Sequence, residues 1–279
     1  MSINYEIEYD NRGRVREHPE IFARWERETK DYRALAKGAQ LGLSYGPAPR
    51  NTVDLFPAKD PNGPFAMFIH GGWWRSLDPS MFSQLAAGPN ANGITVAVVG
   101  YELCPTCSIA DIIEQMRTAT LYLWRKFYKR IFVYGHSAGG HLAACMLATD
   151  WKKIAPDAPA DLVPAAYAIS GVFDLMPLLH VSQNADLRLD EKSARAVSPL
   201  YWPAPMGRTL DAVVGSLESS EFLRQSRAIA EAWGKSAKTR YEQIKGTNHF
   251  TVVDPLGSPD SAMTKRVVDL AKQVAAMKL

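Results

Sequence analysis

Apolar residues in this chain form two alternating kinds of run. Short runs are rich in β-branched and aromatic side chains and end at glycine, histidine or polar turns, which predicts strands. Longer runs place apolar residues at every third or fourth position, which predicts amphipathic helices. The predicted strands are 50–56, 65–69, 95–99, 131–134, 165–170, 210–214 and 239–244, and the predicted helices include 19–37, 109–126, 137–149 and 261–278. Strands that alternate with helices indicate the α/β class, a doubly wound, mostly parallel sheet with helices on both faces.

The chain length and the order of the elements favour a single domain over residues 1–279. Residues 1–45 are expected to form a helical extension, and its helix at 19–37 should pack over the domain edge or over the mouth of a site. The strand at 50–56 alternates apolar and polar residues, as a half-exposed antiparallel strand does. Residues 173–205, rich in proline and polar residues, are expected to be an insertion near the site.

The strand at 131–134 leads into Gly135-His-Ser-Ala-Gly139, which has the spacing Gly-X-Ser-X-Gly. The two glycines let a strand turn sharply into a helix, and such a turn exposes the serine hydroxyl. The start of the following helix directs free N–H groups at this hydroxyl, where acyl transfer develops negative charge. Ser137 is therefore the candidate nucleophile; the alternative is a glycine-rich turn before a packed helix.

A second motif, His70-Gly-Gly-Trp-Trp74, follows the strand at 65–69. Consecutive glycines after a strand can turn their N–H groups towards an oxyanion, together with the N–H of the residue after the nucleophile. The predicted oxyanion hole consists of Gly71, Gly72 and Ala138. The side chains expected to bind substrate are His70, Trp73 and Trp74.

A serine nucleophile needs a neutral imidazole to take its proton. His249 follows the last predicted strand in a turn-rich loop, where the chain order serine, acid, histidine places the base. His136 lies inside the turn around Ser137 and is expected to point away from Oγ. The position of His249 makes it the candidate base.

The acid that orients the imidazole should follow the strand at 210–214, and Glu218 is the first carboxylate in that loop. Asp174, after the strand at 165–170, is the main alternative. Glu221 can already belong to the next helix, and Asp211 begins its strand on the wrong side of the sheet. Glu218 is therefore the candidate acid.

Composition narrows the classes of partner. The chain has 32 basic and 29 acidic residues, a net charge of +3, and no basic run, so we expect no nucleic-acid partner. No run of 18 apolar residues occurs and the first ten residues contain acids where a signal peptide would be basic, which predicts a cytoplasmic protein without a membrane partner. Cys104 and Cys107 form one Cys-X-X-Cys pair and Cys145 lies in an apolar helix, so we expect neither a disulfide framework nor a zinc site.

The motifs around Ser137, at 70–74 and at Asn248-His-Phe250 together resemble the α/β-hydrolase superfamily, and within it the kynurenine formamidase (arylformamidase) branch with its His-Gly-Gly-X-Trp loop. Residues 9–12, 50–54, 101–105, 170–174 and 219–222 resemble the same branch, so the likeness covers nearly the whole chain. Two positions differ: Glu218 stands where the branch usually has aspartate, and Trp73 where tyrosine is frequent.

The resemblance implies an α/β-hydrolase fold and a serine hydrolase that cleaves a small acyl group, with N-formylkynurenine as the first substrate to test. A short-chain carboxylesterase is the alternative within this chemistry. A non-catalytic binding module of the same fold is the alternative of another class, although such modules usually lack the serine, the histidine or the acid. We expect a small-molecule acyl substrate and no metal or organic cofactor, and whether two copies form a homodimer stays open.

Overall fold

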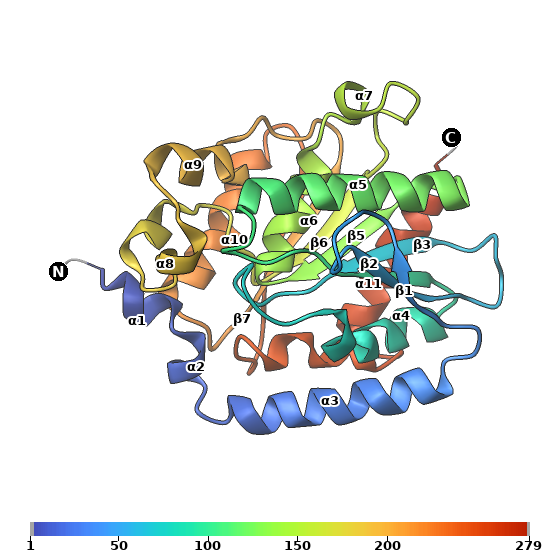
Figure 1. The fold of residues 1–279 in the computed structure, drawn as a ribbon, viewed down its shortest axis with the longest axis horizontal. Helices are drawn as coiled ribbons and strands as arrows, with labels where there is room; N and C mark the ends of the chain where they lie inside the picture. Colours follow the sequence, from blue (N-terminus) through green and yellow to red (C-terminus); the bar gives the residue numbers. More distant parts are fainter. Residues whose placement is uncertain (1–2, 278–279) are drawn as a thin grey trace.

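The computed structural model describes residues 3–277, and these include one eight-stranded sheet (Figure 1). Its strands are β1 (Gln40–Ser44), β2 (Thr52–Phe56), β3 (Phe65–Ile69), β4 (Thr95–Val99), β5 (Phe132–His136), β6 (Ala165–Ile169), β7 (Thr209–Gly215) and β8 (Lys238–Ile244). From edge to edge the order is β1-β2-β4-β3-β5-β6-β7-β8. The pairs β1–β2 and β2–β4 are antiparallel, and the other pairs are parallel.

Helices occupy the connections between the strands. They are α1 (Tyr5–Tyr9), α2 (Asn11–Arg14), α3 (His18–Leu35), α4 (Ala87–Ala91), α5 (Ile109–Phe127), α6 (Ala138–Ala148), α7 (Trp151–Ile154), α8 (Asn184–Leu187), α9 (Glu191–Ala196), α10 (Ser220–Trp233) and α11 (Ala262–Ala275). Short 3-10 helices are η1 (Pro79–Met81), η2 (Ser83–Ala86), η3 (Met176–His180), η4 (Pro199–Tyr201) and η5 (Thr251–Gly257). The predicted α/β class, with a mostly parallel sheet and helices on both faces, is confirmed. The helix predicted at 261–278 ends at Ala275, and Lys278 lies outside the described residues.

Two features at the sheet edge differ from the expectations. β1 lies within the segment expected to be helical; its sequence carries no strand signal, and the strand forms by pairing with β2. β2 was expected to be half-exposed, but four of its five residues are buried. Asp54 explains the difference, because its carboxylate pairs with Arg33 of α3 and accepts the N–H of Gly42 at 2.8 Å. A polar position in this strand is therefore buried with its hydrogen bonds satisfied.

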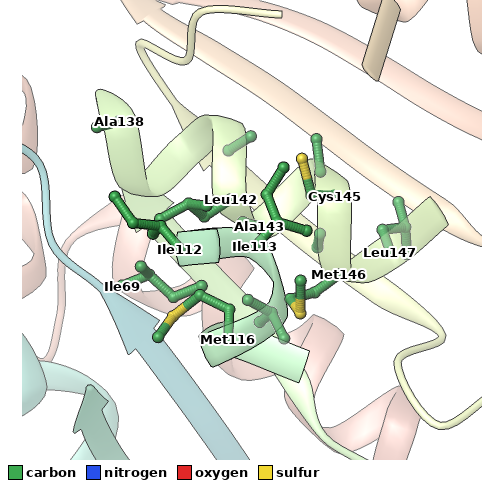
Figure 2. Packing of buried hydrophobic residues seen from close by; sticks show 14 of the residues in the cluster. Ile69, Ile112, Ile113, Met116, Ala138, Leu142, Ala143, Cys145, Met146 and Leu147 are labelled. Atoms are coloured by element: carbon green, nitrogen blue, oxygen red, sulfur yellow. The ribbon is translucent and has the colours of Figure 1, made fainter. Parts of the chain in front are cut away.

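The core is divided by the sheet into two apolar clusters. One lies against α5, α6 and α10, and the other against α3, α11 and η5. Figure 2 shows part of the first cluster, where Ile112 of α5 lies close to Leu142 of α6 and to Ile69 of β3. Every residue of α6 from Ala138 to Leu147 is buried, so the helix that follows the candidate nucleophile is held on all sides.

The N-terminal helices lie outside the layered core. α1 packs beside α10 and η3, whereas α3 runs below the sheet and contacts η1 and η2 (Figure 1). The expected insertion at 173–205 contains η3, α8, α9 and η4. Between residues 3 and 277 no helix has the length and apolar character required to cross a membrane.

Candidate active site

Ser137 lies in the sharp turn between β5 and α6. Its backbone φ of 57° and ψ of −118° lie outside the regions that residues other than glycine normally occupy. A Cβ atom on Gly135 would lie 2.3 Å from the carbonyl oxygen of Gly139, and one on Gly139 would lie 1.9 Å from the carbonyl oxygen of Ile69. Only glycine at these positions lets the strand and the helix approach this closely, which explains the Gly-X-Ser-X-Gly spacing.

His249 and Glu218 form a hydrogen-bonded chain with Ser137. Ser137 Oγ lies 3.1 Å from His249 Nε2, and Nδ1 of the same ring lies 2.6 Å from Glu218 Oε2. Because a carboxylate only accepts hydrogen bonds, Nδ1 carries the proton and Nε2 is free to accept one from Oγ. This arrangement can activate a serine hydroxyl for acyl transfer.

The other oxygen of Glu218 is held by two donors that the sequence did not reveal. Oε1 accepts the hydroxyl of Ser170 at 2.5 Å and the backbone N–H of Gly215 at 2.7 Å. Ser170 directly follows β6 in a left-handed conformation with φ 51°, and Gly215 ends β7. The carboxylate is fully buried, so these donors fix its orientation.

The alternative acids lie elsewhere. Asp174 Oδ2 lies 3.4 Å from Arg224 Nη2, and Glu221 Oε1 lies 2.7 Å from Nε of the same arginine. Asp211 is paired with Arg266 at 2.7 Å. Among residues 3–277, the only acid that forms a hydrogen bond with His249 is Glu218.

His136, inside the turn, contacts His249, the candidate base. Its Nε2–H donates to the backbone carbonyl of His249 at 2.8 Å, and the two rings lie 4.8 Å apart. Burial and the proximity of His249 hold the pKa of His136 well below its ordinary value. A neutral His136 therefore ties the loop of His249 to the turn that carries Ser137.

Gly71, one of the predicted oxyanion-hole donors, lies beside Ser137. A Cβ atom on Gly71 would lie only 3.0 Å from Ser137 Cβ. None of the hydrogen bonds within residues 3–277 uses the backbone N–H of Gly71, Gly72 or Ala138 as donor. These N–H groups are therefore available to a ligand at Ser137.

Two of the three side chains expected to bind substrate are buried in the core. Trp74 is fully buried, and its Nε1–H donates to Nδ1 of His141 at 3.2 Å. His70 is also fully buried and stacks between Phe82 and Tyr101. The structure therefore corrects the expectation that His70 and Trp74 bind substrate. Both side chains are buried in the core and do not line the pocket.

Burial also decides the charge of the imidazoles on either side of this loop. It lowers the pKa of His70 to about 4 and that of His141 to about 4, so both are neutral at pH 7. His141 Nε2–H donates to the carbonyl of Val197 at 2.7 Å, which leaves Nδ1 to accept from Trp74. Neutral His141 thus links the glycine loop to the insertion.

A pocket of about 100 Å³ opens above Ser137. Trp73 lines it, as expected, with its ring edge-to-face to that of Tyr9 at 5.9 Å. The other walls are aromatic and polar. The residues that line the pocket are Tyr9, Asp10, Asn11, Arg12, Phe22, Trp25, Gly71, Gly72, Trp73, Arg75, Ser76, Leu77, Phe82, His136, Ser137, Gln183, His249 and Phe250. Of the insertion, only Gln183 reaches the pocket.

The N-terminal segment supplies part of the pocket wall, and the sequence did not reveal which of its residues do so. Of the two positions considered for the helix at 19–37, the structure places α3 at the mouth of the pocket, with Phe22 and Trp25 in the lining. Trp25 Nε1–H donates to Asp254 at 3.2 Å, and Arg24 pairs with the same carboxylate at 2.7 Å, which joins α3 to η5 directly after His249. Aromatic residues at helical spacing were the available signal, but it does not distinguish a core from a pocket wall.

Metal ligands are not grouped in this region. Across residues 3–277 no cluster of three or more histidine, cysteine, aspartate or glutamate side chains could hold a metal ion. The groups that converge on the pocket are a hydroxyl, an imidazole, a carboxylate and free backbone N–H groups. These are the components of acyl transfer.

Comparison with known proteins agrees with this geometry. A family model described as alpha/beta hydrolase fold matches residues 66–252. Kynurenine formamidase of Danio rerio is 26% identical over 242 residues, which covers 82% of this chain and 81% of the relative. Kynurenine formamidase of Drosophila melanogaster is 28% identical over 246 residues, 80% of this chain and 78% of the relative.

A solved structure is also similar over nearly the whole chain. A candidate thioesterase from Silicibacter sp. TM1040 is 32% identical, superposes with a TM-score of 0.85, and covers 95% of this chain and 99% of its own. The match of the family model includes β4 to β8, nearly all of β3, the turn at Ser137 and the loop of His249. This chain therefore belongs to the alpha/beta hydrolase fold family and is a hydrolase.

Proposed function

We propose that the protein is a serine hydrolase of the arylformamidase type, which releases formate from N-formylkynurenine or a closely related aryl formamide. The observation that carries the proposal is the hydrogen-bonded chain from Ser137 through His249 to Glu218, which opens on an aromatic pocket of about 100 Å³. The similarity to kynurenine formamidases of two animals over most of the chain supports the same substrate class.

In the proposed reaction, Ser137 Oγ attacks the formyl carbon while His249 Nε2 takes its proton. The C–N bond then breaks, and the protonated His249 donates that proton to the leaving aryl amine, so a formyl ester remains on Ser137. A water molecule, deprotonated by His249, attacks this ester; formate leaves and Ser137 recovers its proton. Glu218 keeps the imidazole in the tautomer that both steps require.

The negative charge of each tetrahedral intermediate falls on the former carbonyl oxygen. We assign its stabilisation to the N–H groups of Gly71, Gly72 and Ala138, because these groups are free, Ala138 follows Ser137, and the two glycines line the same pocket as Ser137. Removal of one oxyanion-hole donor from a comparable hydrolase costs about 2.7–4 kcal/mol of transition-state stabilisation. The strained loop, with Trp73 at φ 56° and Trp74 at φ 54°, holds these donors in place.

The decisive experiment compares kcat/KM for N-formylkynurenine with kcat/KM for p-nitrophenyl acetate and p-nitrophenyl butyrate. The proposal requires the formamide to be the better substrate after correction for leaving-group reactivity. A chain that cleaves only the esters is a short-chain carboxylesterase, the alternative within the same chemistry.

Ser137→Ala tests the nucleophile. We expect kcat to fall by roughly 10⁶, the size found when the serine of a comparable hydrolase is removed. The variant should fold normally, because a Cβ is already present in the turn. Full activity of Ser137→Ala would contradict the assignment.

We also propose that the enzyme works in the cytoplasm. Cys104, Cys107 and Cys145 are all free thiols, as expected in a reducing compartment. Fractionation of cells that express the chain with a C-terminal tag tests this location; activity confined to a secreted fraction would contradict it.

A further inference from the structure

Residues 9–12 form one wall of the pocket and are tied to the start of α10. The hydroxyl of Tyr9 donates to Glu221 Oε2 at 3.0 Å and accepts from Gln225 Nε2 at 2.8 Å. One residue earlier, the carboxylate of Glu8 accepts the N–H of Glu221 at 3.0 Å. Asn11 and Arg12 are therefore held at defined positions beside the nucleophile.

Asn11 places an unsatisfied amide in this wall. It is only 5% exposed and lines the pocket together with Ser137 and His249. Its Nδ2 is buried and has no hydrogen-bond partner among the described residues. A buried donor without an acceptor is costly to a fold, so its presence at the pocket indicates an acceptor supplied by a ligand.

Arg12 supplies a cation at the same wall. Its guanidinium lies 5.8 Å from the ring centroid of Phe22, and both residues line the pocket. Within residues 3–277 no carboxylate forms an ion pair with Arg12, whereas the other arginine of the pocket, Arg75, is paired with Asp186. The guanidinium of Arg12 is therefore free to bind an anion.

The acid next to these residues is already engaged. Asp10 Oδ1 accepts the N–H of Gly13 at 2.9 Å and so caps α2. The polar wall thus offers the donors of Asn11 and Arg12, and Oδ1 of the Asp10 carboxylate between α1 and these residues is turned to the N–H of Gly13. An incoming carboxylate would meet two donors there, one of them charged, which is the stronger kind of hydrogen bond.

We propose that Asn11 and Arg12 form a leaving-group subsite that binds a carboxylate carried by the substrate. The inference rests on the proposed function in one respect: with a small acyl group at Ser137, the larger and charged part of the substrate is its leaving group. Phe22, Phe82 and Phe250 line the same pocket and give it an aromatic wall against which an aromatic ring can pack. The preferred substrates are therefore aryl amides or esters with an anionic group on the aryl side.

The test uses two substrates that differ only in charge, 2-formamidobenzoate and 2-formamidobenzamide. The readout is the ratio of kcat/KM for the anion to kcat/KM for the neutral amide. We expect Arg12→Gln to lower this ratio roughly 10- to 100-fold, the usual size for a hydrogen bond to a charged group, mainly through KM. Arg16→Gln removes the same charge from an exposed residue that does not line this pocket, and should leave the ratio unchanged.

Asn11→Leu tests the amide separately. Leucine has a similar size and no polar atom to leave unsatisfied, so the variant should fold, as thermal unfolding will show. The ratio should again fall. A ratio equal to that of the wild type in Arg12→Gln and Asn11→Leu, or an equal fall in Arg16→Gln, would overturn the subsite.

Failure of the proposed function gives a different result. In that case the wild type cleaves neither formamide, and the same ratio is measured with 3-acetoxybenzoate and 3-acetoxybenzamide. A charge preference that depends on Arg12 with these esters supports the subsite without the formamidase reaction. If the wild type and all variants cleave the anionic and the neutral ester equally well, the proposed carboxylate subsite is rejected.

Discussion

Glu218→Gln is the substitution whose effect the structure defines most closely. In the wild type, Oε1 accepts from Ser170 and from Gly215 N–H at 2.7 Å, while Oε2 accepts from His249 Nδ1 at 2.6 Å. A glutamine has one acceptor end and one donor end. Because the N–H of Gly215 can only donate, it requires the amide oxygen of the glutamine at the Oε1 position.

The amide NH₂ then faces His249 Nδ1, which must accept. The proton of the neutral imidazole then sits on Nε2, next to the hydroxyl of Ser137. Nε2 can therefore no longer accept the proton of that hydroxyl. A base in the wrong tautomer lowers kcat by about 10⁴ in a comparable triad, which corresponds to about 5–6 kcal/mol of transition-state stabilisation. The fall should appear in kcat, with KM nearly unchanged.

The assay is steady-state hydrolysis of the best substrate by the wild type, Glu218→Gln and the matched control Asp174→Asn. Asp174 is also buried and paired, but with Arg224 rather than with His249. The control should retain activity within a few-fold. A Glu218→Gln variant that is folded and as active as Asp174→Asn would refute the assignment of the acid.

Other consequences concern the tryptophans and the buried histidines. Wild-type enzyme should prefer acetyl over octanoyl p-nitrophenyl esters, and Trp73→Ala should reduce that preference, because Trp73 lines the pocket; a wild type that prefers octanoyl esters would exclude a small acyl pocket. Trp74→Ala should instead lower the free energy of unfolding by about 3–5 kcal/mol in urea titrations, since it empties a core site and removes the donor to His141. The pKa of His70 and of His141 is lowered to about 4, so the unfolded chain binds more protons below pH 6.5. Stability should therefore fall as pH drops from about 6.5 to about 4, by roughly 3 kcal/mol for each histidine; an unfolding free energy that is constant from pH 7 to pH 4.5 would contradict this.

Local sequence patterns were sufficient to predict strands β2 to β8. The β-branched run at 95–99 and the turn at Ser137 predict β4 and the β5–α6 junction, because a buried parallel strand and a strand-to-helix turn each have a strong local sequence pattern. β1 has no such signal. Its residues are mostly exposed, and only pairing with β2 makes them a strand.

The chain order of the reacting groups predicted which residues meet. The contacts among Ser137, Glu218 and His249 join residues that lie far apart in the chain. Each of the three follows a strand of the same sheet, so the order of the strands brings them together. The orientation of a side chain is a different matter. Trp73 and Trp74 are neighbours in the sequence and both have positive φ, but one faces the pocket and the other the core. Nothing in the order of residues decides between them, because packing against α6 does.

The attachment of α1 to α10 has a consequence for synthesis of the protein. Tyr9 is made well before the groups that hold it, because Glu221 and Gln225 follow more than 200 positions later in the chain. The nascent chain can therefore assemble most of its sheet before the pocket has its polar wall. Binding of a charged substrate would then be acquired only when α10 has been made and α1 docks onto it.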